Sequence, residues 1–234
     1  MNFKGQTAMI TGAAGNLGHA VAAAFAAAGA NLVLLDLNED TLKKTPTAGA
    51  GDVLHQRVDL TDTASIAAAV NAALARFGRI DALCNIAGGF DMGDKVHELP
   101  AAKWNFMMEL NAGSVLRTAQ AVVPHMLKAG GGRIVNIGAN SALSGKAEMG
   151  AYVASKSAVI RLTETMAAEL RSHNINVNCV LPSIIDTPQN RAAMPKADPV
   201  KWVAPEALAD VLLFLCSPAA RAIHGAAIPV LGLS

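Results

Sequence analysis

The sequence has few of the features that mark specialised classes of protein. Its formal net charge is only +1 over 234 residues and no run of like charges occurs, so neither nucleic acid nor an anionic membrane is an expected partner. Its three cysteines, Cys84, Cys179 and Cys216, lie in apolar runs and lack the paired spacing of metal ligands. We therefore expect reduced, buried thiols in a cytoplasmic protein, and no metal site.

Long hydrophobic runs are missing as well. The N-terminal segment MNFKGQ has no signal-peptide core, and the alanine-rich run from Ala20 to Ala28 ends at Gly29, well short of the roughly 20 apolar residues that span a bilayer. Hydrophobic residues nevertheless make up 52% of the chain and charged residues only 16%. This balance predicts one soluble, core-rich domain over residues 1–234 that associates with copies of itself.

What the sequence does contain is a regular alternation of short apolar runs and longer helical stretches. The order predicts a doubly wound (Rossmann) α/β fold, a seven-stranded parallel sheet with helices on both faces that binds ligands beyond the carboxyl ends of its strands. The expected strands are Thr7–Thr11, Asn31–Leu35, Val53–Val58, Ile80–Ile86, Arg133–Ile137, Asn174–Leu181 and Ala226–Val230. The expected helices are His19–Ala28, Thr63–Phe77, Ala101–Leu127, Gly150–Leu170 and Pro205–Cys216.

Three glycines, Gly12, Gly15 and Gly18, separate the first expected strand from the first helix. Glycine lets the backbone approach a pyrophosphate closely, and the helix that follows points its free N–H groups at the anion. A plain strand–helix turn is the alternative. Asp36 follows the second strand, where a carboxylate can accept hydrogen bonds from an adenosine ribose and repel a 2′-phosphate, which favours NADH. The alternative is that Asp36 begins the next helix, although Asn38 is the better-placed cap.

Tyr152 and Lys156 stand four residues apart in an expected helix, so their side chains project from one face. An ammonium held near a phenol favours the phenolate, and we expect Lys156 to lower the pKa of Tyr152 toward the neutral range. Many helices carry such a pair on a solvated face, so the spacing alone is weak evidence of catalysis.

Six motifs together resemble the short-chain dehydrogenase/reductase family over nearly the whole chain. They are TGAAGNLG, Asp36, VDLTD from Val58, NIAG from Asn85, ELNAG with Asn111, and YVASK from Tyr152. The resemblance implies that Tyr152 is the proton donor, that Lys156 binds the nicotinamide ribose, and that Asn111 holds a water of a proton relay. It implies an NAD site formed by Gly12, Gly15, Asn16, Leu17, Gly18, Asp36, Asp59, Leu60, Asn85, Ala87, Gly88, Tyr152, Lys156, Pro182 and Thr187.

The sequence departs from the family pattern at three positions. Asn16 replaces the usual middle glycine, which we attribute to the ease with which asparagine enters the left-handed region, and Ser183 replaces a glycine after the proline. Ala139 stands thirteen residues before the tyrosine, where the family has its substrate-orienting serine. Ser141 either supplies the missing hydroxyl or caps its own loop; the two interpretations are equally favoured.

The second half also resembles the dihydropteridine reductases, in GANSAL, in EMGAY and in the segment from Leu181 to Pro205. That branch likewise has alanine at the serine position, whereas Asn111 and NIAG are more similar to the general dehydrogenases. We predict an NAD(H)-dependent oxidoreductase for a small carbonyl or alcohol, or for a conjugated pterin- or quinone-like substrate. The alternatives are a dihydropteridine-reductase-like enzyme and a non-catalytic NAD(H) scaffold or sensor. Residues 188–204 are expected to form a short substrate lid, and the two longest helices to form a dimer or tetramer.

Overall fold

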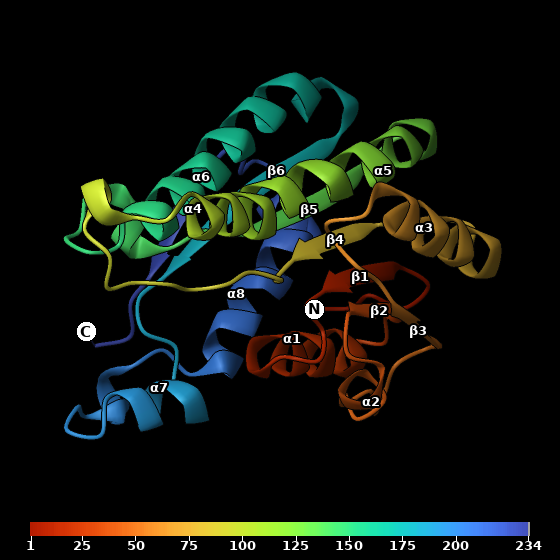
Figure 1. Ribbon diagram of the computed structural model, residues 1–234. Helices are drawn as coiled ribbons and strands as arrows, with labels where there is room; N and C mark the ends of the chain where they lie inside the picture. The colour runs from red at the N-terminus through yellow and green to blue at the C-terminus, as the bar shows by residue number, and fades with distance from the viewer. Residues whose placement is uncertain (234) are drawn as a thin grey trace.

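A computed structural model describes residues 1–233 of the chain. Seven parallel strands form one sheet in the order β3-β2-β1-β4-β5-β6-β7, which confirms the predicted doubly wound architecture (Figure 1). The strands are β1 (Thr7–Thr11), β2 (Asn31–Asp36), β3 (Val53–Arg57), β4 (Ala82–Asn85), β5 (Gly132–Ile137), β6 (Ile175–Pro182) and β7 (Ala227–Val230).

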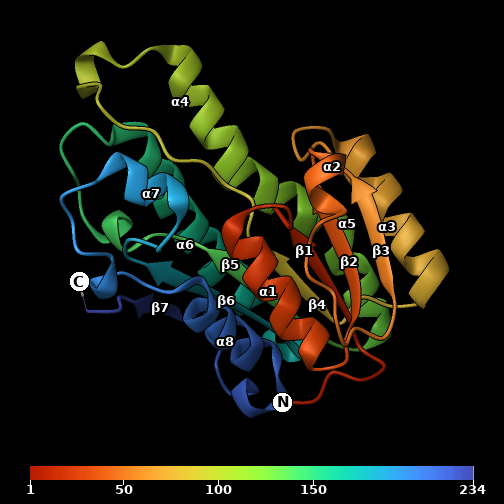
Figure 2. The same cartoon turned by 90° about the horizontal axis from the view of Figure 1, so that it is seen from below.

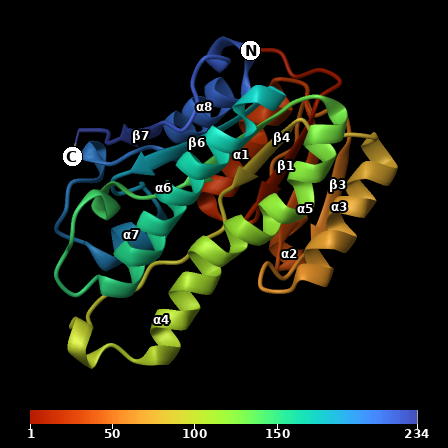
Figure 3. The same ribbon diagram turned by 90° about the horizontal axis from the view of Figure 1, so that it is seen from above.

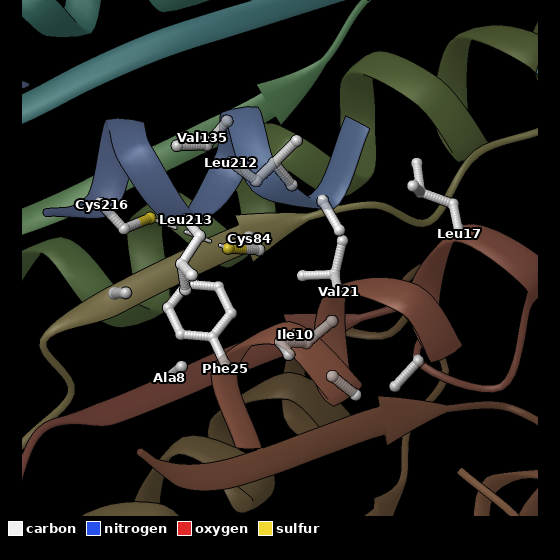
Figure 4. Packing of buried hydrophobic residues seen from close by; sticks show 14 of the residues in the cluster. Ala8, Ile10, Leu17, Val21, Phe25, Cys84, Val135, Leu212, Leu213 and Cys216 are labelled. Carbon is white, nitrogen blue, oxygen red and sulfur yellow. Dashed lines mark hydrogen bonds between the residues drawn. The ribbon is translucent and has the colours of Figure 1, made fainter. Parts of the chain in front are cut away.

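Helices cover both faces of the sheet because alternate strand residues point to opposite sides. On one face α1 (Asn16–Ala27) and α8 (Pro205–Cys216) bury Ile10, Phe25 and Leu212 (Figures 2 and 4). On the other face α3 (Thr63–Phe77), α5 (Ser114–Ala129) and α6 (Gly150–Leu170) lie side by side over Met9 and its neighbours (Figure 3). Two short helices, α2 (Glu39–Leu42) and α7 (Pro188–Ala193), follow β2 and β6.

The capping residues explain where several helices begin. Asn38, Asp62 and Thr187 each accept a hydrogen bond from a backbone N–H two or three residues along, at the start of α2, α3 and α7. Gly78 ends α3 in the left-handed conformation, with φ +76°. The predicted bounds of α3, α6 and α8 are confirmed, whereas α1 begins at Asn16, three residues before the predicted start.

The fourth strand is shorter than predicted and ends at Asn85. The N–H groups of Ile86 and Ala87 donate to Thr11 Oγ1 at 3.1 and 3.2 Å. These side-chain contacts replace the ladder of backbone hydrogen bonds, so the chain leaves the sheet after Asn85 although the apolar run continues.

The stretch predicted as one helix over Ala101–Leu127 is interrupted. It consists of α4 (Ala101–Met107), a π-helical segment η2 (Met108–Gly113) and α5. The three pieces follow one another as a single long rod that extends past the end of the sheet (Figure 3). Within η2 the Leu110 carbonyl accepts a 2.6 Å hydrogen bond from Ser114 Oγ, which compensates for the altered backbone ladder. None of the helices within residues 1–233 has the length and apolarity needed to cross a bilayer.

Candidate active site

The glycine turn after β1 is packed so closely that side chains are excluded at two of its three glycines. A Cβ on Gly12, whose φ is +66°, would lie 2.8 Å from the backbone of Ala87, and a Cβ on Gly18 would collide with the Gly12 carbonyl and lie 2.7 Å from Ala13 Cα. Gly15 is exposed and meets only the Gly12 carbonyl, at 3.4 Å. The turn therefore leaves the N-terminus of α1 open at Gly15, as a pyrophosphate cradle requires.

Asn16 is the first residue of α1 and does not have a positive φ, so our left-handed explanation for it was wrong. Its Nδ2 donates a 2.8 Å hydrogen bond to Oε1 of Gln189 in α7. Asn16 thus links the glycine turn to the segment predicted as a lid, while the next residue, Leu17, is buried in the core.

Asp36 is the last residue of β2 and lies beside the glycine turn. Its Oδ2 accepts from Ala14 N at 3.0 Å and its Oδ1 from Asn38 N at 3.1 Å. The cap of α2 is Asn38, whose side chain accepts from Thr41 N. The structure therefore excludes the alternative in which Asp36 begins the next helix.

Asp59 and Leu60 follow β3 on the same edge of the sheet. Oδ1 of Asp59 accepts from both the backbone N–H and the hydroxyl of Thr61, at 2.8 and 2.7 Å. The hydroxyl hydrogen bond is the main reason that the pKa of Asp59 is lowered. The Leu60 carbonyl accepts from Arg117 Nε at 2.8 Å, which ties this edge to α5.

Asn85 is the last residue of β4, and its side chain points into the protein interior. Its side chain is buried, donates from Nδ2 to Asn136 Oδ1 at 2.9 Å and accepts from Thr118 Oγ1 at 2.9 Å. Asn136 in turn donates to Thr163 Oγ1 at 2.9 Å. The amide of Asn85 thus joins two central strands to α5 and α6, and its expected place in the cofactor cleft stays a prediction; Ala87 and Gly88 occupy the loop after it.

Asn111 clamps the loop that follows β4. Its Oδ1 accepts from Gly89 N at 2.9 Å, while its Nδ2 donates to the Gly89 carbonyl at 3.2 Å and to Ser155 Oγ at 2.9 Å. Both N–H donors of the amide are thereby used within the protein. A Cβ on Gly88 would lie 2.8 Å from Asn111 Oδ1 and 3.0 Å from Lys156 Nζ. The loop, Asn111 and Lys156 therefore meet at Gly88; the water relay stays a prediction.

Lys156 and Tyr152 project from α6 into this region. Lys156 is only 5% exposed and donates from Nζ to the Ile137 carbonyl at 2.9 Å. Burial lowers the pKa of Lys156 to about 8 and raises the pKa of Tyr152 to about 12. The expected lowering of the Tyr152 pKa was thus wrong for the protein alone, since the desolvation of the phenol outweighs any stabilisation of its anion by Lys156.

The aromatic ring of Phe90, in the loop after β4, packs against the ring of Tyr152. The centroids of the Phe90 and Tyr152 rings are 4.9 Å apart, with an interplanar angle of 75°, an edge-to-face arrangement. Our prediction from the sequence missed Phe90, as it missed Gly89 and Ser155, although all three lie next to motif residues. Gly89 and Phe90 directly follow NIAG, and Ser155 lies within YVASK, which was the available signal.

Ala139, at the usual serine position, is 4% exposed and belongs to an apolar cluster with Cys179 and Leu181, against which Tyr152 packs. Ser141 is half-buried in a short 3₁₀ turn, η3 (Asn140–Leu143). The adjacent Ala142 carbonyl accepts from Ser157 Oγ at 2.9 Å, so this turn is attached to α6. The choice between an orienting role and a loop role for Ser141 stays open.

Pro182 and Thr187 flank the start of the predicted lid. Pro182 ends β6, and Thr187 Oγ1 accepts from Asn190 N at 3.2 Å as the cap of α7. Ser183, between them, donates from its hydroxyl to the Leu231 carbonyl at 2.8 Å, a contact that the glycine of the family pattern cannot make. Predicted cofactor residues from β1, β2, β3, β4 and β6 therefore all lie at the carboxyl ends of their strands.

No group of three or more His, Cys, Asp or Glu side chains within residues 1–233 is arranged to hold a metal ion. In the loop after β4, Asp94 and Asp91 form ion pairs with Lys103, at 2.6 and 3.6 Å. The two carboxylates thus share one ammonium group on α4.

Comparisons with known proteins agree with this geometry. The family model described as short chain dehydrogenase matches residues 6–198. The chain is 34% identical over 233 residues to an NAD-dependent glycerol dehydrogenase of Listeria innocua, a match that covers 96% of this chain and 91% of the relative. It is 34% identical over 240 residues to cis-4-hydroxycyclohexanecarboxylate dehydrogenase of Sinomonas cyclohexanicum, covering 98% and 96%. The crystal structure of levodione reductase superposes with a TM-score of 0.92 at 28% identity, covering 99% of this chain and 98% of that one.

Proposed function

The chain belongs to the short-chain dehydrogenase family, and on that premise we propose that it is an NAD(H)-dependent oxidoreductase. Its substrate would be a small carbonyl or alcohol, with Tyr152 exchanging a proton with the substrate oxygen. The observation that carries the proposal is the convergence at Gly88, where a Cβ would lie 2.8 Å from Asn111 Oδ1 and 3.0 Å from Lys156 Nζ. The loop after β4 and Asn111 of η2 thereby adjoin α6, the helix that bears both Lys156 and Tyr152.

The residues around the glycine turn fit a dinucleotide. Gly12 and Gly18 admit no Cβ, Gly15 leaves the end of α1 open, and Asp36 lies beside the turn at the end of β2. We propose that the turn holds the pyrophosphate, that Asp36 holds the adenosine ribose, and that Lys156 holds the nicotinamide ribose. When bound, the nicotinamide supplies or accepts the hydride. The carboxylate of Asp36, which would repel a 2′-phosphate, supports NAD over NADP, as does the named cofactor of the glycerol dehydrogenase relative.

Three side chains would prepare the proton transfer. Asn111 fixes the Gly89 backbone through two hydrogen bonds and holds Ser155, so it sets the distance between the loop and α6. Lys156, with a pKa lowered to about 8, can change its charge near neutrality. Tyr152 is protonated in the protein alone, since burial raises its pKa to about 12, which suits it to donate a proton during carbonyl reduction.

The buried methyl group of Ala139 supports a second candidate, a dihydropteridine-reductase-like reaction. A quinonoid pterin is already strongly electrophilic, so its reduction needs less polarisation by a hydroxyl at this position. A simple ketone would instead need the donor to come from Ser141. We also retain a cytoplasmic location as a proposal, supported by three buried cysteines that carry no disulfide.

The proposal is tested by comparing wild type with Tyr152→Phe. Turnover of NADH should be followed with small ketones, quinones and quinonoid dihydropterin, and NADH affinity should be measured by titration calorimetry. We expect the variant to lose turnover of every substrate while its NADH affinity changes little, because the ring remains and only the proton donor is lost. Binding of NADH without turnover in the wild type would favour the scaffold or sensor, and unaltered turnover in Tyr152→Phe would remove Tyr152 from the reaction.

A further inference from the structure

We propose that Phe90 is a specificity-determining residue that holds a carbocyclic ring beside Tyr152, so that the enzyme favours cyclic alcohols and ketones over acyclic polyols. The inference rests on the proposed function and names its substrate class. It begins from the edge-to-face contact of the Phe90 ring with Tyr152, at a centroid distance of 4.9 Å.

The position of Phe90 is fixed by its neighbours in the chain. Gly89, directly before it, is held at both backbone polar groups by the side chain of Asn111. Gly93, three residues after it, donates from its N–H to the Glu148 carbonyl at 2.8 Å, and Asp94 forms a β-bridge with Met149. The arch 89–94 is thus anchored at both ends, and its second anchor lies directly before the helix that carries Tyr152. The backbone around Phe90 is therefore held in place next to Tyr152.

The ring of Phe90 has area left for a ligand. Phe90 is 60% exposed although it touches Tyr152, and Met92, on the same arch, is 51% exposed. Large apolar side chains in an anchored loop remain in water at a free-energy cost unless a ligand covers them. An aromatic face beside the proton donor suits a flat or puckered hydrocarbon ring.

The surroundings of Tyr152 are also apolar on its other side. The phenol packs against the cluster that contains Ala139, Ala142 and Leu181, so a methyl group stands where the family has a hydroxyl. A substrate with one oxygen needs only Tyr152, or Tyr152 and Ser141, as partners. Each further hydroxyl of a polyol would be desolvated against carbon, which is unfavourable. The apolar side chains that favour a hydrocarbon ring therefore disfavour the binding of a polyol.

The test compares kcat/KM for cyclohexanol and glycerol, with NAD⁺ in excess, in wild type, Phe90→Ala and Phe90→Leu. A matched control is Phe214→Ala, which removes a 37% exposed phenylalanine from α8 on the opposite face of the sheet. We expect wild type to prefer cyclohexanol. Phe90→Ala should lower that kcat/KM about tenfold, mainly through KM, and change glycerol turnover less than twofold. Phe90→Leu should fall between, and Phe214→Ala should match wild type.

Three outcomes overturn the proposal without touching the oxidoreductase activity. They are a wild-type preference for glycerol, an equal loss of kcat/KM for both substrates in Phe90→Ala, which would mean that Phe90 only supports Tyr152, and a kcat/KM for cyclohexanol that Phe90→Ala leaves unchanged. If neither alcohol is turned over, saturation-transfer NMR with cyclohexanone and the NADH-loaded protein decides: transfer that is lost in Phe90→Ala supports the proposal, and no transfer in wild type overturns it. Failure of the proposed function itself is recognised separately, by turnover that survives Tyr152→Phe.

Discussion

Lys156 is held out of water with the carbonyl of Ile137 as its hydrogen-bond acceptor. Burial of the ammonium lowers its pKa from 10.5 to about 8. Between these values the unfolded chain binds more protons than the folded one, so this residue makes stability rise with pH over that window. The free-energy cost of burying the charged Lys156 side chain is fully present below about pH 8 and disappears as the pH approaches 10.5. A shift of this size corresponds to about 3 kcal/mol.

We therefore expect Lys156→Met to be more thermostable than wild type at pH 7, with a difference that shrinks toward pH 10. Differential scanning calorimetry across pH 6.5–10 measures it. Lys146→Met, which alters an exposed lysine, should show a constant difference over the same range. A pH-independent effect of Lys156→Met would mean that the ammonium is not desolvated.

Asp36 permits a second test at the scale of one side chain. Its carboxylate lies beside the glycine turn, where a 2′-phosphate on the ribose would meet a like charge within a few ångströms. Asp36→Asn keeps the shape and removes the charge, so the affinity ratio of NADPH to NADH should rise about tenfold or more. Fluorescence titration of both cofactors measures the ratio. Asp40→Asn removes an exposed carboxylate on α2 and should leave the affinity ratio unchanged. An equal effect of both variants would show that Asp36 does not bind the ribose.

The roles of positions 139 and 141 can be separated by adding a hydroxyl group at Ala139 and removing the one at Ser141. If the substrate is already electrophilic, Ala139→Ser should leave its turnover nearly unchanged and add activity toward simple ketones, by about 10²-fold where a new donor reaches the oxyanion. If Ser141 already orients the substrate, Ser141→Ala should abolish ketone reduction and Ala139→Ser should restore it. Steady-state kinetics of both single variants and the double variant distinguish the two cases. Ketone reduction that survives Ser141→Ala alone, with alanine at both positions, would exclude a hydroxyl at either position from the reaction.

At the scale of elements, the periodic patterns predicted those helices and strands whose formation depends on residues close together in the chain. The bounds of α3, α6 and α8 followed from helical spacing, with Asp62 capping α3 and Pro205 beginning α8, and the seven strands followed from apolar runs between turns. The π-helical segment around Asn111 did not follow, because it depends on hydrogen bonds to Gly89 and Ser155, which are far away in the sequence. For the same reason the inward direction of Asn85 and the contact of Phe90 with Tyr152 required the packed structure.

The hydrogen bond between Asn16 and Gln189 joins two elements across the proposed pyrophosphate site. It holds α7 against the start of α1, so we expect its loss to speed cofactor release. One such hydrogen bond contributes about 1 kcal/mol, or roughly fivefold in rate. Stopped-flow displacement of NADH should show this acceleration in Asn16→Ala and in Gln189→Ala, with no further gain in the double variant. Additive effects would show that the two side chains act separately.

At the scale of the whole molecule, the long rod formed by α4, η2 and α5 leaves large apolar side chains in water. Trp104 is 41% exposed, Phe106 58%, Leu116 46% and Leu127 40%. Together with the neighbouring α6 (Figure 3), this surface supports the expected dimer or tetramer. Multi-angle light scattering at micromolar concentration should show a mass at least twice the 24.0 kDa of one chain.

A charge on that surface should separate the subunits. Phe106→Glu should shift the mass toward that of one chain, since a carboxylate buried between two apolar surfaces is strongly unfavourable. Val200→Glu places the same charge on the 80% exposed Val200, outside the rod, and should leave the mass unchanged. A wild-type protein of 24.0 kDa would refute self-association at that concentration.

The hydrogen bonds that run from Thr118 through Asn85 and Asn136 to Thr163 also bear on how the chain finds its sheet. Strands that are apolar on both faces pair almost equally well after a slip, so hydrophobic burial alone says little about alignment. A slip of one residue would turn an asparagine amide toward α1 and α8, among carbon atoms, and leave a threonine hydroxyl without its partner. These four polar groups therefore favour the native alignment of β4 with β5 during folding, because a misaligned sheet loses their hydrogen bonds. This selection does not depend on a ligand.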